Sequence, residues 1–189
     1  ATLAVDGVVQ GLFDYGEAIN DGQVGLGTRN AVSRFDNLSI QVTGAGTALP
    51  YSEDFEDGTA DALAPATGTW VINGAKRYRG TADPRENAVS LVQFIDPLPD
   101  TVDLKATVKS KDVSGFSANG LLIFDYQNAD NFKFAGFFVG LGEWRIGRWF
   151  NGAVEVKARV DDTIAVETDT PVMVERASAG PYIKTPVRK

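Results

Sequence analysis

The amino-acid sequence predicts an all-β protein built from two packed antiparallel sheets. Short runs rich in β-branched and aromatic residues are separated by glycine, proline, asparagine and aspartate along all 189 residues. No stretch shows the sustained 3.6-residue apolar spacing of an amphipathic helix. One sheet of so many strands would leave a face unburied, which favours a sandwich. We expect strands at Leu3–Val5, Val24–Thr28, Ser33–Val42, Thr69–Asn73, Ala88–Phe94, Val102–Lys109, Gly120–Asp125, Asn131–Val139, Trp144–Phe150, Val154–Val160 and Thr170–Glu175.

Two hairpin turns are predicted by their dipeptides. Asn151-Gly152 lies between two β-type runs, and Asn-Gly supplies both positive-φ residues of a type I′ turn. Asp6-Gly7 gives a second such signal, with Val8-Val9 resuming the strand. Both dipeptides therefore predict antiparallel strand pairs.

The chain has one internal linker candidate, Thr43–Pro50, which is rich in small residues and ends in proline. This segment separates residues 1–42 from residues 51–176. The length of the whole chain suits one domain that contains both parts. Ala177–Lys189 has the composition of a loop or tail, with an edge strand at Tyr182–Lys184 as the alternative.

From Tyr51 onward the sequence resembles bacterial concanavalin A-like and laminin-G-like domains. The resemblance rests on Glu53–Gly58 followed by Gly68-Thr69-Trp70, and on Gly120–Tyr126 with Asp130–Phe134 as a central strand pair. Trp144–Arg148 and the Asn-Gly turn match the next hairpin. The resemblance implies a jelly-roll sandwich in a secreted, extracellular or cell-surface protein that binds a glycan or another surface polymer.

Residues 1–42 resemble the closing strands of such a domain, although they come first in this chain. The chain is either circularly permuted or a segment of a tandem array cut inside a repeat. Thr2–Val5 should then pair antiparallel with Val172–Glu175, because a lone terminal strand cannot satisfy its backbone. The partner strand belongs to the same chain, which we favour, or to the next chain, which would give head-to-tail self-association.

Composition narrows the possible partners. Twenty-five acidic and 18 basic residues give a formal charge of −7, which disfavours nucleic acid. No apolar run approaches the roughly 20 residues of a membrane span. The absence of cysteine and histidine removes thiolate chemistry and the commonest general base, so a bound metal would be held by oxygen.

Calcium is the predicted cofactor, because acidic residues cluster at the start of the main body. Asp54, Glu56 and Asp57, with Glu53 and Asp61 nearby, can supply several of the six to eight oxygens that calcium takes. Strand alternation would put Asp54 and Glu56 on one face. The resemblance brings Asp36 next to this segment. The alternative is a solvated acidic edge that discourages aggregation.

A glycan site is predicted around Trp149, with Arg145 and Asp125 as neighbours. Alternation along Trp144–Phe150 points at most one of the two tryptophans into the core, and we expect Trp149 to be the more exposed. A flat ring beside hydrogen-bonding groups suits a sugar. The alternative is a half-buried surface tryptophan.

These observations favour a non-catalytic extracellular binding or adhesion module, glycan-directed and stabilised by calcium. The first alternative is a structural repeat or a self-assembling fibre subunit of a bacterial surface protein. The second is a glycoside hydrolase, but the acidic cluster departs from the alternating carboxylate pattern of concanavalin-like glycosidases, and Glu155 and Glu167 lack such partners.

Overall fold

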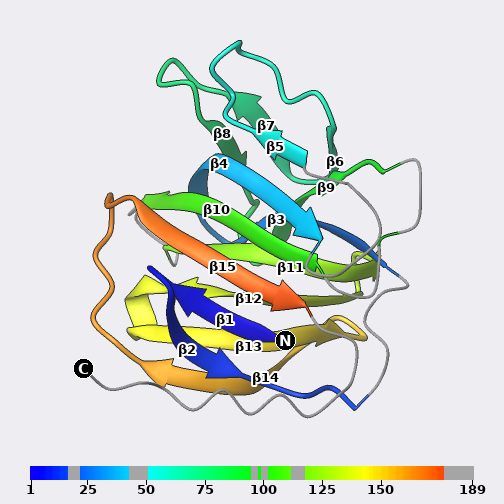
Figure 1. The fold of residues 1–189 in the computed structure, drawn as a ribbon, viewed down its shortest axis with the longest axis vertical. Coiled ribbons are helices and arrows are strands. Elements are labelled where there is room, and N and C mark those ends of the chain that lie inside the picture. The colour runs from blue at the N-terminus through cyan, green and yellow to red at the C-terminus, as the bar shows by residue number, and fades with distance from the viewer. Residues whose placement is uncertain (17–21, 43–50, 95–97, 99–101, 112–117, 177–189) are drawn as a thin grey trace.

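The computed structural model describes residues 1–16, 22–42, 51–94, 98, 102–111 and 118–176, and confirms two antiparallel sheets packed as a sandwich (Figure 1). Sheet A runs in the order β2 (Val8–Leu12), β1 (Thr2–Val5), β15 (Thr170–Arg176), β10 (Val102–Lys111), β4 (Val32–Val42), β8 (Tyr78–Thr81), β7 (Thr69–Ile72), and β5 (Tyr51–Glu53) also pairs with β4. Sheet B runs in the order β14 (Ala153–Asp161), β13 (Glu143–Phe150), β12 (Asn131–Phe138), β11 (Asn119–Asn128), β3 (Gln23–Arg29), β9 (Asn87–Val92), β6 (Leu63–Thr67).

The described residues among the first 42 are an integral part of this sandwich. They supply β1 and β2 at one end of sheet A, β4 inside sheet A, and β3 inside sheet B. Strand β1 pairs antiparallel with β15 of the same chain, with Leu3 opposite Val174. The predicted joining of the two ends is therefore confirmed, and β1 lies beside β15 in Figure 1.

Both predicted hairpin turns are present. Asn151 and Gly152 have φ of 51° and 75°, and Asp6 and Gly7 have φ of 47° and 75°. Each pair joins two antiparallel strands, β13 to β14 and β1 to β2. All four residues therefore have the left-handed backbone that a type I′ turn requires.

All eleven expected strands are present within a few residues of their expected bounds, β2 follows the Asp6-Gly7 turn as predicted, and the remaining three of the fifteen described strands were missed. Strand β5 has three residues, β6 contains Pro65, and β8 reads Tyr-Arg-Gly-Thr, so none shows a usable alternation. Strands β6 and β7 are separated only by Gly68, whose φ of 74° lets the chain turn from sheet B into sheet A. A Cβ at this glycine would lie 2.3 Å from that of Ala88.

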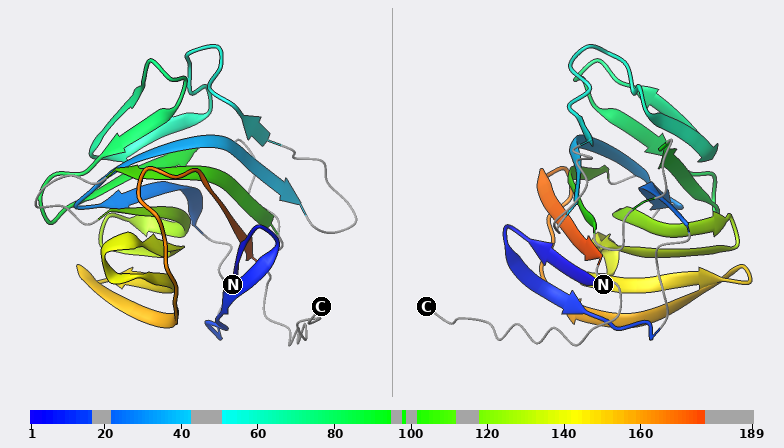
Figure 2. Two further views of the ribbon diagram at one scale, coloured as in Figure 1. Left: turned by 90° about the vertical axis from the view of Figure 1, so that its left-hand side faces the viewer. Right: turned by 45° about the vertical axis from the view of Figure 1, so that its right-hand side comes forward.

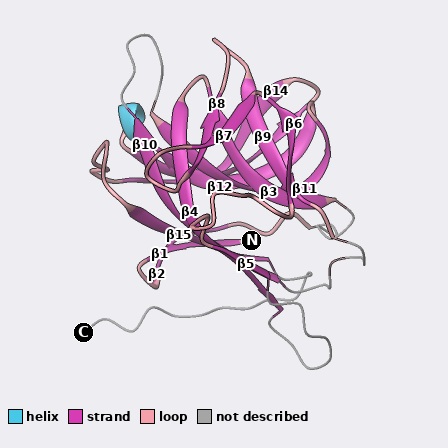
Figure 3. Ribbon diagram, turned by 90° about the horizontal axis from the view of Figure 1, so that it is seen from above, coloured by secondary structure: helices cyan, strands magenta, loops and turns pink. Residues whose placement is uncertain are grey.

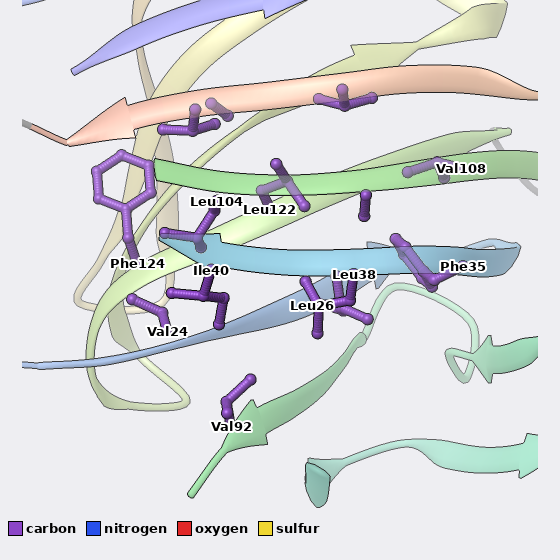
Figure 4. Close-up of a cluster of buried hydrophobic side chains, with 14 of the residues drawn as sticks. Val24, Leu26, Phe35, Leu38, Ile40, Val92, Leu104, Val108, Leu122 and Phe124 are labelled. Atoms are coloured by element: carbon purple, nitrogen blue, oxygen red, sulfur yellow. The ribbon is translucent and has the colours of Figure 1, made fainter. Parts of the chain in front are cut away.

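The main core lies between the sheets, where alternate residues of facing strands meet. On β4 the inward residues are Phe35, Leu38 and Ile40, and on β11 they are Leu122 and Phe124. Figure 4 shows these side chains converging with those of neighbouring strands. All of these side chains are buried. Because burial of a large apolar side chain stabilises the fold by about 1.5–3 kcal/mol, the main core is the dominant stabilising contribution.

Two predictions fall on residues 43–50 and 177–189, namely the linker and the tail, and both lie outside the described residues. Within the described ranges the structure has one short 3₁₀ turn, Val139–Leu141, and no helix long and apolar enough to cross a membrane.

Candidate ligand cleft

Sheet B carries apolar side chains on both faces. Its inner face belongs to the main core, while its outer face holds a second cluster, here called the second core, which is also buried. The sheet is strongly twisted and curved (Figures 2 and 3). Side chains of its outer face pack against one another and close to strand glycines, as Ile123 does at Gly27 and Phe134 at Gly147. The second core consists of Val89, Leu91, Leu121, Ile123, Phe132, Phe134, Phe138 and Trp149.

Trp149 belongs to this second core. As predicted, Trp144 and Trp149 lie on opposite faces of β13, with Trp144 in the main core. Trp149 is the more exposed of the two, as expected, at 7% against 3% for Trp144, but both rings are buried, so Trp149 does not offer an open stacking surface. Its ring stacks on Phe132 at 6.0 Å, and the guanidinium of Arg29 lies 4.1 Å above the ring centre.

A cleft of about 350 Å³ opens at this end of the second core. It lies where the end of β3, the loop before β9 and the turns that follow β11 and β13 come together. Its lining mixes charged, amide and apolar groups from segments distant in sequence. The lining residues are Arg29, Thr67, Gly68, Asp83, Arg85, Glu86, Asn87, Val89, Ala129, Asp130, Trp149 and Gly152.

Arg29 is held firmly on the floor of the cleft. The side chain of Asn119 accepts a hydrogen bond from the Arg29 backbone N–H at 2.9 Å and donates one to the Arg29 carbonyl at 2.7 Å. The guanidinium donates to the Asn87 side chain at 3.4 Å. Burial lowers the pKa of Arg29, while the nearby Glu86 carboxylate raises it. The guanidinium stays charged at neutral pH and is oriented before any ligand arrives.

The loop that forms one wall is fixed by Asn30, which has φ of 44°. Its backbone N–H donates to the Glu86 carbonyl at 2.9 Å, and its side chain accepts from the Arg85 backbone N–H at 2.9 Å. A turn closes the loop through a bond from Glu86 N–H to the Asp83 carbonyl. The exposed side chains of Asp83, Arg85 and Glu86 are therefore presented from a pinned backbone.

The cleft can bind a polar ligand by hydrogen bonds in both directions. Its two guanidinium groups only donate, and its three carboxylates accept when ionised. Asn87 offers both kinds of group. Opposite charges nearly balance in the lining, so the cleft does not select for a strongly charged ligand.

The other two residues of the predicted glycan site do not join Trp149 in this cleft. Asp125 has φ of 50° in an irregular part of β11, which turns its carboxylate onto the opposite face. There it forms an ion pair with Lys133 beneath the ring of Tyr15. Arg145 shares the outer face with Trp149, but lies four residues along β13, over Phe138 and 2.6 Å from Glu143.

The predicted calcium ligands are not gathered into one group. Asp54 accepts a hydrogen bond from the Glu56 backbone, and Asp57 accepts from Thr59, which lowers the pKa of Asp57. Strand β5 ends at Glu53, so alternation does not align Asp54 with Glu56. Among the described residues no group of three or more acidic side chains is placed to hold a metal ion.

Asp36 lies near this segment, as expected, because β4 pairs with β5. Its carboxylate, however, forms an ion pair with Arg77 at 3.2 Å. The segment is anchored instead by Phe55, which has φ of 60°, is fully buried and stacks on Tyr78 with ring centres 5.5 Å apart.

Sequence reasoning missed Arg29 and the loop at residues 83–86. Arg29 ends a regular strand and resembles any polar residue at a strand end. Its proximity to Trp149 depends on the order of strands in sheet B, where β3 lies three places from β13. The clustering of Asp83-Pro84-Arg85-Glu86 was a turn signal, but a turn alone does not indicate a site.

The fold and the cleft define a two-sheet β-sandwich with a polar cleft at one end of its curved sheet. Comparison of the chain with protein-family models, with curated proteins and with solved structures gave no match.

Proposed function

We propose that this protein is a non-catalytic binding module that holds a polyhydroxylated ligand, such as a segment of a glycan, in the cleft above Trp149. The observation that carries the proposal is the oriented Arg29, whose guanidinium lies over an aromatic ring at the base of a polar cleft. Sugars are bound by few well-placed polar groups next to an apolar surface. Sugar hydroxyl groups both donate and accept, as do the groups of this cleft.

A neutral or weakly charged glycan fits this lining best. Arg29 and Arg85 supply two positive charges, and Asp83, Glu86 and Asp130 supply three negative ones. A polyanionic ligand would meet the three carboxylates as well as the overall charge of −7. A ligand that bridges guanidinium and carboxylate groups through hydroxyls avoids that repulsion.

The carboxylates of the cleft support binding rather than hydrolysis. A glycosidase needs one carboxyl group that stays protonated, which requires a desolvated site. Asp83, Glu86 and Asp130 are all exposed. We therefore propose that the cleft binds its ligand without cleaving it.

At the level of the fold, we propose that the sandwich is a jelly roll of the concanavalin or laminin-G type in rotated strand order, belonging to an extracellular or cell-surface protein. The support is the pairing of β1 with β15, which joins the two ends of the chain as that resemblance requires.

Binding can be tested by affinity electrophoresis against a panel of neutral and uronate-containing polysaccharides. We expect retardation by at least one neutral polymer, and a loss of at least tenfold in affinity for Arg29→Ala. Arg145→Ala is the matched control, since that arginine shares the face of the sheet but not the cleft, and it should bind as the wild type does. No retardation by any polymer, or release of reducing ends, contradicts the proposal.

Calcium stabilisation stays a prediction, with no support from the placement of Asp36, Asp54, Glu56 and Asp57. An ion that binds only the folded protein stabilises it by ~2.7 kcal/mol at a hundredfold excess over Kd. Thermal unfolding in calcium and in chelator measures this directly. Identical melting curves would remove calcium from the proposed function.

A further inference from the structure

The four strands at the ends of the two sheets differ in how well they are protected against pairing with a strand of another molecule. In sheet B, end strand β14 carries four charged residues among its nine, and the other end strand, β6, contains Pro65. Charge and proline on an edge prevent a further strand from adding to it. Both edges of sheet B are therefore guarded, that is, protected against the addition of another strand.

Sheet A lacks this protection at both ends. Strand β2 reads Val-Val-Gln-Gly-Leu and strand β7 reads Thr-Trp-Val-Ile, so neither has a charge or a proline. Apolar side chains on these two strands are exposed, at 61% for Val8, 53% for Val9, 56% for Leu12 and 40% for Val71. Each of these strands is an end of the described sheet, with backbone groups available to another strand.

The hairpins at the two ends of sheet A carry opposite charge. Residues 2–14, which hold β1 and β2, contain Asp6 and Asp14 and no lysine or arginine. Residues 69–81, which hold β7 and β8, contain Lys76, Arg77 and Arg79 and no acidic residue. A β2 edge that met a second β2 edge would bring like charges together, whereas a β2 edge that meets a β7 edge pairs opposite ones.

We propose that β2 of one copy pairs with β7 of a second copy, so that sheet A continues from chain to chain. The contact is heterologous, since it joins two different edges, and it propagates head to tail. Main-chain hydrogen bonds supply affinity, as in other cases of strand addition. This assembly requires no exchange of β1, whose place beside β15 is already filled within the chain.

The test uses two variants that each block one edge. Val9→Lys places a charge on β2, and Val71→Lys places one on β7, both at exposed positions where the fold tolerates lysine. We expect sedimentation equilibrium of the wild type to show an average mass that rises with concentration past that of a dimer. Each variant alone should remain at the mass of one chain.

An equimolar mixture of the two variants distinguishes this contact from other modes of association. Each variant keeps one competent edge, so the mixture should form dimers and stop there. Val154→Lys is the matched control, because it adds lysine to the guarded β14 edge at a similarly exposed valine, and it should associate as the wild type does.

Three outcomes would overturn the proposal. The first is a wild type that stays monomeric at every concentration. The second is dimers of Val71→Lys alone, which would show that β2 pairs with itself. The third is an equal loss of association in Val154→Lys. Unchanged melting temperatures in all three variants ensure that the comparison concerns edges and not folding.

Discussion

Trp144 and Trp149 lie five residues apart on strand β13 and occupy two different kinds of interior. Trp144 is 3% exposed in the main core, where its ring meets Phe137 and its indole N–H donates to Asp162 at 3.0 Å. Trp149 is buried on the outer face of the same sheet, between Phe132 and a charged guanidinium. Among the described residues, the ring of Trp144 is packed between the two sheets, and the ring of Trp149 contacts side chains of its own sheet.

The difference shows that side chains on the outer face of an antiparallel sheet can be buried although no second sheet among the described strands covers them. Such faces are usually polar because water reaches them. In sheet B, strand glycines leave room for large side chains on the outer face. A Cβ at Gly27 would come within 2.7 Å of the Ile123 side chain, and one at Gly147 within 2.7 Å of the Phe134 ring. Large residues and glycines thus interlock on one face.

The largest expected effect is in the main core. Trp144→Ala removes a ring enclosed by both sheets and leaves the Asp162 carboxylate without its indole donor. We expect the free energy of unfolding to fall by about 3–5 kcal/mol, as for other buried tryptophans. Urea unfolding followed by circular dichroism measures this change. If Trp144→Ala lowered the free energy of unfolding by less than Trp149→Ala does, the second core and not the main core would contribute more to stability.

Trp149→Ala should cost somewhat less, about 3 kcal/mol, because Trp149 lines the cleft and the flexible Arg29 side chain that lies over its ring can move into part of the cavity. The same urea titration measures this loss in the free energy of unfolding. A variant that melts with the wild type would show that the ring is open to solvent and that the second core does not hold the sheet together.

Gly147→Ala tests the interlocking of glycine and ring. The new methyl group would press on the Phe134 ring and on the Glu155 carbonyl, both 2.7 Å away, so we expect a loss of about 1–3 kcal/mol. Gly140→Ala is the control, since nothing lies within 4 Å of its Cβ position. Equal melting temperatures for both variants would contradict tight packing on the outer face.

The smallest expected effect belongs to Arg29→Met, which keeps a flexible apolar stem but removes the charge over Trp149. A cation above a ring contributes about 0.5–2 kcal/mol, so we expect a loss of about 1 kcal/mol. Acrylamide quenching of tryptophan fluorescence should increase as water reaches the ring. Arg145→Met, which uncovers Phe138 instead, should leave the quenching unchanged.

Much of the strand pattern was predictable, because regular alternation and Asn-Gly turns are local properties. The pairing of Thr2–Val5 with the last strand was also predictable, since a lone strand needs a partner. The position of the Asp125 carboxylate was not, because a single residue at φ of 50° reverses the face on which it lies. Nor was Arg29 identifiable, since its partners Trp149 and Asn119 are assembled by topology rather than spacing.

The predicted metal ligands are not gathered together among the described residues, for a related reason. A run of carboxylates in a strand would share a face at every second residue, but this run begins where β5 ends. Its short side chains then accept hydrogen bonds from the backbone two residues on, as Asp54 and Asp57 do. Acidic composition predicted the charge of the segment correctly but not the direction of its side chains.

The antiparallel pairing of β1 with β15 determines how this protein would respond to mechanical load. Thr2, at the start of β1, lies opposite Glu175, near the end of β15, so a force that pulls on the two chain ends acts at the same end of both strands. Such a force opens the ladder one hydrogen bond at a time, like a zipper, instead of shearing all of the bonds together. The terminal hairpin would therefore peel away at low force and lengthen the chain, while the cleft on sheet B, held by other strands, stays intact.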